Sequence, residues 1–335
     1  MTAAEGIDAG VPAHYGDPLR EQRRLAEQGG TVDRSNRGVI AVSGPERLTW
    51  LHDITTQHLL GLQPYQGTET LVLSPHGHVE HHAMLVDDGE TTWLDTEPGA
   101  AAGLLDFLTK MRFFAKVELR DATAEYAVLS VFGGPYELAP PEILPLPGPK
   151  FATGTVPSRP TARYAAEEQP GGGFARRGRL GVDLLVPRSR SEQTLQQAAA
   201  RCGIWGYEAL RVAARIARLG VDTDHRTLPH EVGWLATDVH LEKGCYRGQE
   251  TVARVHHLGR PPRRLVLLHL DGSADQLPAP GTDVESDGRR VGFLGTAVHH
   301  YEEGPIGLAV VKHNVAADAA LTVAGMAAAI DPDRD

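Results

Sequence analysis

Apolar and polar positions first fall into a regular pattern at residue 37, and this pattern predicts a strand, a helix and a β-meander. Residues 37–42 are a mostly apolar run typical of a strand. Ser43 is placed to cap a helix, because Glu46 follows three residues later and apolar side chains recur at positions 48, 51, 54 and 59. Three further apolar segments, separated by turn sequences, are expected as the strands of the meander: residues 69–73, 78–86 and 91–95.

The following part of the chain predicts mixed elements without the strict alternation of a parallel sheet. The expected elements are a helix at 98–111, strands at 115–120, 126–132 and 180–186, a helix at 191–203, and a helix after 206 with apolar residues up to 217. Residues 133–178 are rich in proline and glycine and predict loops around one or two short strands. We therefore expect an α+β fold.

Beyond residue 261 the pattern changes to short β segments that suggest a small C-terminal β-barrel. The five expected strands are residues 264–270, 283–285, 290–299, 306–312 and 320–324. The domain prediction is an N-terminal extension at 1–35 with partial order at most near its start, a main region of two subdomains at 36–260, and the barrel at 261–330.

Composition and charge narrow the class of protein. The chain has 335 residues, 41% of them hydrophobic, which fits a globular protein of more than one domain. A net charge of -10 argues against a general nucleic-acid binder. Two cysteines provide neither a disulfide framework nor the four thiolates of a conventional iron–sulfur cluster. Without a candidate membrane span or signal peptide, we expect a cytoplasmic protein.

The densest group of chemically active residues is the segment K-G-C-Y-R-G-Q-E-T-V-A-R at residues 243–254. Gly244 and Gly248 allow backbone angles closed to other residues, so a sharply bent loop is expected there. A regular element resumes at Gln249. The segment thus predicts a functional loop that leads into a helix.

Cys245 in this loop is a candidate reactive thiol. Lys243 and Arg247 lie two residues to either side, and a following helix N-terminus adds positive potential, which favours the thiolate. A buried, inert cysteine is the alternative, and it is the role expected for Cys202 on the apolar face of a helix. A cysteine hydrolase would pair Cys245 with a histidine such as His256 or His257 and an orienting carboxamide or carboxylate, and nothing in the sequence fixes that partner.

Four histidines at positions 76, 78, 81 and 82 raise the question of a metal site. Neighbouring side chains on a strand point to opposite faces, so only some of the four could converge. No cysteine or carboxylate cluster completes a ligand set, and we favour a structural or surface role with no metal. Neither a dinucleotide-binding glycine motif nor a P-loop occurs in the chain.

The segment K-G-C-Y-x-G-Q-E at 243–250 resembles the signature of the YgfZ family of folate-binding proteins, relatives of the glycine-cleavage T-protein. The resemblance extends to residues 43–47, 77–79, 116–118, 222–231 and 306–311. It implies a three-part, T-protein-like architecture around a central folate channel. It also implies support for the assembly or repair of iron–sulfur enzymes, including those that modify tRNA.

The same resemblance assigns roles to residues of the signature. Cys245 is the working, catalytic thiol. The residues expected to bind tetrahydrofolate or a derivative are Lys243, Gly244, Tyr246, Arg247, Gly248, Gln249, Glu250 and Arg254. The implied partners are a reduced folate and iron–sulfur proteins or their assembly factors, without direct nucleic-acid or membrane contact.

Two positions depart from the T-protein pattern. The strand after Gly77 has imidazoles at His81 and His82 where the T-protein has its catalytic aspartate, so we expect no glycine-cleavage aminomethyl transfer. Ala213 stands where the superfamily usually has a pteridine-binding glutamate, and Glu208 and Glu231 are nearby candidates to replace it. Two alternatives stay open: a folate-dependent one-carbon transferase or demethylase with a changed substrate, and a non-catalytic adaptor.

Overall fold

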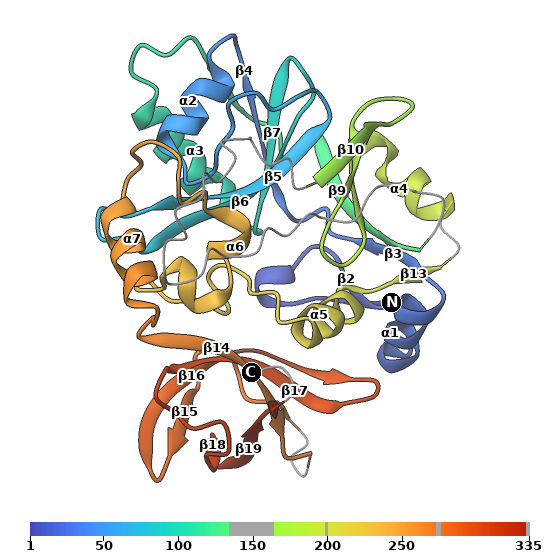
Figure 1. Ribbon diagram of the computed structural model, residues 1–335. Helices are drawn as coiled ribbons and strands as arrows, with labels where there is room; N and C mark the ends of the chain where they lie inside the picture. The colour runs from blue at the N-terminus through green and yellow to red at the C-terminus, as the bar shows by residue number, and fades with distance from the viewer. Residues whose placement is uncertain (134–163, 198–199, 273–275, 333–335) are drawn as a thin grey trace.

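The computed structural model describes residues 1–133, 164–197, 200–272 and 276–332. Figure 1 shows a large α+β part above a separate C-terminal barrel. The α+β part is built on an eleven-stranded sheet. In spatial order its strands are β13 (Arg201–Cys202), β3 (Gly30–Asp33), β9 (Tyr126–Phe132), β12 (Val182–Pro187), β11 (Phe174–Arg177), β10 (Tyr164–Glu168), β5 (Gln66–Leu73), β6 (Val79–Asp87), β7 (Thr91–Thr96), β4 (Gly38–Ser43) and β8 (Glu118–Asp121).

Helices and two small strands surround this sheet. The longer helices are α1 (Pro18–Glu27), α2 (Arg47–Ile54), α3 (Ala101–Met111), α4 (Arg188–Gln197), α5 (Ile204–Ala213) and α7 (Gln249–Leu258). The short elements are β1 (Thr2–Ala3), β2 (Pro12–His14), α6 (Leu235–Asp238) and two 3-10 turns at Gly6–Asp8 and Pro229–Val232. No helix among the described residues combines the length and apolarity needed to cross a bilayer.

The predicted meander is confirmed, because β5, β6 and β7 pair antiparallel in succession and β4 then pairs with β7. The predicted capping of the next helix is wrong. Ser43 is the last residue of β4 and pairs with Thr91 and Glu118, so the helix begins only at Arg47. Glu46 occupies the cap position without a side-chain hydrogen bond.

The expectation of partial order at the start of the chain is also wrong. The carboxylate of Asp17 accepts hydrogen bonds from the first backbone amides of α1, which fixes the start of that helix. Strand β3 pairs with β9 inside the main sheet. Asp8 reaches an ion pair with buried Arg218, 2.9 Å away. The first 35 residues are therefore built into the same core, and the domain boundary at residue 35 stays a prediction.

The C-terminal strands form a closed barrel in the order β14 (Arg263–Leu270), β17 (Gly304–Lys312), β16 (Arg289–His300), β15 (Asp283–Ser286), β18 (Leu321–Val323) and β19 (Met326–Ile330). Five of these strands were predicted. The sixth, β19, was missed because its alanine-rich sequence has little intrinsic preference for a strand. Pairing of β19 with both β14 and β18 closes the barrel.

Two helix predictions in the middle of the chain need correction. The helix expected at 191–203 is α4, which ends at Gln197, and Cys202 lies in strand β13. The cysteine is buried as expected, with its Sγ 3.6 Å from the carbonyl of Glu21. Helix α5 ends at Ala213, so Ala217 lies beyond it. Within the expected loop region at 133–178 the structure has β10 and β11, and residues 134–163 lie outside the described residues.

Candidate functional site

The signature segment forms a surface loop that leads into α7 at Gln249, as predicted. Cys245 is exposed at the surface of this loop. The next residue, Tyr246, points inward and is 7% exposed, and its burial raises the pKa of the phenol. The loop therefore presents a thiol to solvent and is anchored by an aromatic side chain one residue away.

Lys243 attaches the loop to the end of helix α2. Its side chain is buried, and its Nζ donates hydrogen bonds to the carbonyl oxygens of His52 and Thr55, the latter at 2.6 Å. These carbonyls lie at the C-terminal end of α2, where helix carbonyls lack intrahelical partners. Burial lowers the pKa of Lys243 to about 8, against the opposing charge of Asp53. Lys243 thus fastens the loop to α2.

Only one of the two signature glycines needs its special backbone freedom. Gly248 has a φ of 81°, and a Cβ there would lie 2.6 Å from the carbonyl oxygen of Ser74 and 2.9 Å from the Cα of Gly77. The loop and the turn before β6 consequently pack backbone against backbone. Gly244 has no positive φ and open space around it, so the expectation of unusual backbone angles at Gly244 is wrong.

The remaining signature residues point in different directions. Arg247 forms an ion pair of 2.9 Å with Glu80 at the surface. Gln249 donates a hydrogen bond to the carbonyl of Lys243 at 3.4 Å. Glu250 and Arg254 lie exposed on α7. Their predicted folate contacts stay predictions, and the structure gives Arg247 and Gln249 partners within the protein.

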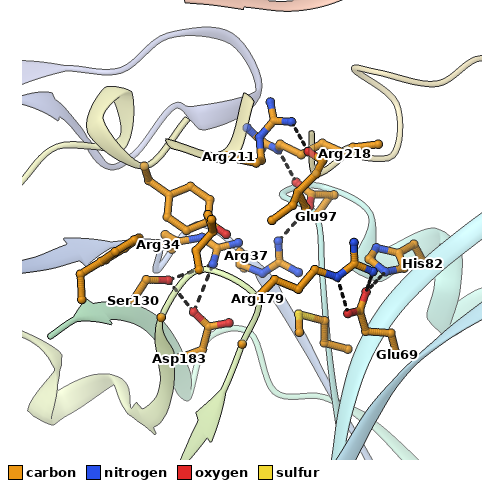
Figure 2. A pocket seen from close by; sticks show the side chains of 18 of the residues that line it. Arg34, Arg37, Glu69, His82, Glu97, Ser130, Arg179, Asp183, Arg211 and Arg218 are labelled. Carbon is orange, nitrogen blue, oxygen red and sulfur yellow. Dashed lines mark hydrogen bonds and ion pairs between the residues drawn. The ribbon is translucent and has the colours of Figure 1, made fainter. Parts of the chain in front are cut away.

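A cavity of about 60 Å³ lies at the centre of the α+β part. Figure 2 shows its charged lining, in which arginines alternate with carboxylates. The labelled lining residues are Arg34, Arg37, Glu69, His82, Glu97, Ser130, Arg179, Asp183, Arg211 and Arg218. They come from sequence segments far apart in the chain. No described residue of the signature segment 243–254 lines this cavity.

One part of the lining is an ion-pair network around Glu97. This carboxylate lies 2.9 Å from Arg37 and 2.8 Å from Arg218. Burial alone would raise the pKa of Glu97, but Arg218 and Arg37 lower it well below its ordinary value. Arg37 also pairs with Asp95 at 2.9 Å. The cations that face the cavity from this side are thus matched by carboxylates.

A second part of the network joins α5 to the barrel. Arg211, which is 1% exposed, pairs with Glu208 at 2.7 Å and with Asp222 at 2.8 Å. Its guanidinium also donates a hydrogen bond to Thr296 on β16 at 2.6 Å. Burial opposes ionisation of Glu208, but Arg211 and Arg218 lower its pKa to about 2. The carboxylate of Glu208, a candidate pteridine ligand, is therefore already paired with two arginines of the protein.

The carboxylate of Glu231, the other candidate pteridine ligand, is also bound within the protein. Glu231 accepts a hydrogen bond from the backbone amide of Leu228 at 2.9 Å and pairs with Arg263 at 2.8 Å. Its carboxylate is fully buried in this arrangement. Neither glutamate offers a free carboxylate to replace the one missing at Ala213.

His82 forms the third part of the lining, on the strand where the T-protein aspartate was expected. Its Nε2 lies 3.2 Å from Glu69 and 3.0 Å from Asp238. The ring stacks on Trp234 with centroids 4.9 Å apart. Arg179 pairs with Glu69 at 3.0 Å from the other side. The imidazole and the guanidinium thus face two buried carboxylates, of which Asp238 has its pKa raised by burial and by the charge of Glu69.

The electrostatics keep a proton on this imidazole. Burial lowers the pKa of His82, but Asp238 and Glu69 raise it to about 9. Burial likewise opposes ionisation of Glu69, yet Arg179 and His82 lower its pKa to about 2. Ligand atoms of Glu69, His82 and Asp238 lie within 4.8 Å of one another, as a metal site requires. A cation there would have to displace both the proton and Arg179.

The neighbouring histidines have separate surroundings. His81 packs beside Phe107, with ring centroids 6.0 Å apart. His76 and His78 lie near each other in the preceding turn, with ring centroids 6.3 Å apart. Only His82 of the four lines the central cavity. The strand alternation anticipated this divergence.

A folate does not fit the cavity in this conformation. Pockets that hold ligands of that size have volumes of roughly 300–1,000 Å³, and the central cavity has about 60 Å³. The side chains of its ion pairs line this small space closely. Entry of the ligand requires some of these side chains to move apart.

Comparisons with known proteins agree with this architecture. Residues 263–334 match the family model of the CAF17, C-terminal beta-barrel domain. The whole chain superposes with a TM-score of 0.75 and 17% identity on glycine cleavage system aminomethyltransferase T from Bartonella henselae, covering 98% of this chain and 92% of that one. The chain has the aminomethyltransferase T fold. The predicted T-protein-like α+β architecture with a C-terminal barrel is thereby confirmed.

Sequence relatives carry two kinds of name. The chain is 28% identical over 302 residues to a putative chloroplastic transferase of Arabidopsis thaliana, which covers 85% of this chain and 66% of the plant protein. It is 25% identical over 333 residues to a mitochondrial homologue of iron-sulfur cluster assembly factor IBA57 of Aspergillus fumigatus, with 87% and 72% covered. The assignment to the YgfZ family specifically stays a prediction.

Most residues of the cavity network were not predicted from the sequence. Arg176 and Asp183 are buried on adjacent strands and pair with each other at 2.9 Å. Asp95 pairs with Arg176 at 2.6 Å from a third strand. The sequence did contain one signal for these residues, which is a charged residue within an otherwise apolar strand. Such a residue predicts a buried ion pair, because a charge is buried only when it is paired.

Proposed function

We propose that this chain supports the assembly or repair of iron–sulfur proteins through the Cys245 loop. The observation that carries the proposal is the exposed thiol on a loop whose neighbouring residues are buried or clamped to α2. Such a fixed, accessible thiol suits contact with a partner protein or its cluster. The relatives named as assembly factors support the same function.

The iron–sulfur enzymes that the protein supports include, in this proposal, those that modify tRNA. The expected location of the protein is the cytoplasm. A reduced folate stays part of the proposal because the aminomethyltransferase T fold supports it. The small cavity weakens it, since binding requires the pairs around Arg179 and Arg218 to open. Calorimetry with tetrahydrofolate and its formyl derivative tests this part separately. Lack of binding at millimolar concentration would remove folate and leave the thiol function intact.

The same cavity disfavours the alternative of a folate-dependent one-carbon transferase. Such an enzyme must hold the folate and a second substrate together, with their reacting atoms about 3–3.5 Å apart. The described cavity has room for neither. Formation of a one-carbon product at enzymatic rates would reverse this conclusion.

Genetic complementation tests the main proposal. A strain that lacks the chain should lose activity of several iron–sulfur enzymes, a tRNA-modifying one among them, and the wild-type chain should restore it. Cys245→Ala should fold normally and fail to restore the activity. Cys202→Ala is the matched control and should restore it, because its thiol is buried. Full rescue by Cys245→Ala would mean that the signature cysteine has no working role.

Alkylation of the folded protein tests the difference between the two thiols directly. Cys202 is 1% exposed, and burial raises the pKa of its thiol to about 11, so little thiolate is present at neutral pH. Cys245 is exposed. Peptide mapping after timed alkylation should show Cys245 labelled at least about 100-fold faster. Equal rates would contradict the assignment of the loop cysteine as the accessible thiol.

A further inference from the structure

An exposed aromatic pair stands at the end of α3. Phe113 and Phe114 are 77% and 99% exposed, whereas most large apolar side chains of the described residues are in the core. Solvent exposure of two adjacent phenylalanines gives up the free energy that their burial would supply. Side chains placed in this way commonly mark a contact surface.

The backbone holds the pair in a fixed and strained turn. The amide of Ala115 donates to the carbonyl of Arg112 at 2.8 Å, which closes a β-turn with the two phenylalanines at its tip. Phe113 has a φ of 43°, in the region that favours glycine and is unfavourable for an aromatic residue. Strain of this kind persists where surrounding contacts enforce it, and it is concentrated at functional sites.

Two contacts brace the turn. The indole Nε1 of Trp50 on α2 donates to the carbonyl of Met111 at 3.0 Å, just before the turn. Just after it, the amide of Lys116 donates to the carboxylate of Glu46 at 2.8 Å. The aromatic tip is thus pre-organised, which lowers the entropy lost when it binds.

The turn and the Cys245 loop share one support. Trp50 and the carbonyl of His52, which accepts from Lys243, both belong to α2. This helix has eight residues and a length of about 12 Å. A partner surface of ordinary size buries about 800 Å² on each side and is wider than that distance. The aromatic tip and the Cys245 loop are therefore both fastened to one helix that is shorter than such a surface is wide.

We propose that Phe113 and Phe114 are the docking point of the iron–sulfur protein that meets Cys245, an inference that rests on the proposed function. The occupant is a protein surface with an apolar pocket and an acidic rim. Arg112 and Lys116 flank the tip, are exposed, and have no ion pair among the described residues. Arg112 and Lys116 carry two positive charges against the one carboxylate of Glu46 that binds the turn, and in a chain of net charge -10 this local excess favours an acidic partner rim.

The test is a double variant, Phe113→Gly with Phe114→Ser. Glycine relieves the strained φ and serine removes an exposed ring, so the fold and the alkylation rate of Cys245 should stay unchanged. At native expression the variant should lose at least about tenfold of the iron–sulfur enzyme activity restored by wild type. Overexpression should recover it, because mass action compensates for weak docking. Leu19→Ser, an exposed apolar residue on α1, is the matched control and should rescue at both levels.

Photo-crosslinking identifies the occupant. A benzophenone side chain at position 114 should form an adduct with an iron–sulfur protein or an assembly factor, and the same group at position 19 should not. Full rescue by the double variant at native expression, together with failure of Cys245→Ala, overturns the docking inference and leaves the proposed function standing. Failure at both expression levels with an intact fold also overturns it. The two phenylalanines could instead be required for binding to anionic phosphatidylglycerol vesicles. That result would show that the tip contacts membranes and would reject the protein partner.

Discussion

The central cavity and the Cys245 loop are both rich in charged residues, but they differ in how completely the charges are satisfied. In the cavity, buried arginines such as Arg37 and Arg211 are each matched by two carboxylates. In the loop, buried Lys243 is satisfied by backbone carbonyls, and Cys245 remains at the surface. The comparison separates a region that holds the fold together from one that is available to a partner.

Removal of a cation from the cavity network should have the largest effect on stability. Arg211→Met leaves Glu208 and Asp222 as buried carboxylates without this partner, and breaking a buried pair typically costs about 3–5 kcal/mol. Urea denaturation should show a decrease of that size in the free energy of unfolding. The variant also loses the hydrogen bond to Thr296, so the barrel should become easier to cleave by protease.

Arg23→Met on the exposed face of α1 is the control for this prediction. Its pair with Glu27 spans 3.9 Å, and both side chains are more than half exposed. A pair of this kind contributes about 0–1 kcal/mol. If Arg211→Met lowered the free energy of unfolding by only this amount, the buried ion pairs would contribute no more than surface pairs. The contrast drawn between the cavity network and the Cys245 loop would then be wrong.

The sequence predicted the loop far better than the cavity, and the reason is physical. The signature residues are consecutive, so their spacing alone indicated a bent loop before a helix at Gln249. The cavity pairs join residues far apart in sequence, such as Arg218 and Asp8, and only the folded chain brings them together. Strands with clear alternation were predicted correctly. The anchoring role of Lys243 was not predicted, because its partners are backbone carbonyls of α2 and no sequence pattern indicates them.

The pH dependence of stability should report on His82. Its pKa is raised from 6.5 to about 9, so the folded state binds the proton more tightly than the unfolded state. The stabilisation is fully present below pH 6.5 and is lost as the pH rises through 9. The expected loss is up to about 3 kcal/mol. Urea denaturation of wild type and His82→Gln across this range should show the His82 contribution as the difference between the two proteins, because Lys243, whose pKa is lowered to about 8, adds a slope of opposite sign to both.

Imidazole NMR provides the internal comparison for that titration. His52, beside Lys243 at the loop, has a pKa lowered to about 4 by burial and by the Lys243 charge, so it should be neutral at pH 7. His82 should be protonated at the same pH. A neutral His82 at pH 7 would contradict the charge balance assigned to Glu69 and Asp238.

The two signature glycines offer a matched pair of substitutions within the loop. Gly248→Ala places a Cβ against the carbonyl of Ser74 at a positive φ and should cost about 2 kcal/mol. Gly244→Ala meets open space at an ordinary φ and should change the free energy of unfolding by less than about 0.5 kcal/mol. Thermal unfolding measures both. Similar values for the two would show that the loop does not pack against the turn before β6.

The smallest effect is expected at Arg247, the signature cation at the surface. Its pair with Glu80 spans 2.9 Å, and both side chains are about 38% and 37% exposed, so water and salt screen the attraction. Arg247→Gln should lower the free energy of unfolding by less than about 1 kcal/mol, and 0.5 M salt should remove the difference. Complementation by the same variant then separates two roles, because a loss of rescue without a loss of stability assigns Arg247 to partner or ligand contact. A destabilisation of about 2 kcal/mol or more that persists in salt would instead place Arg247 with Lys243, in the frame that holds the loop on the body of the protein.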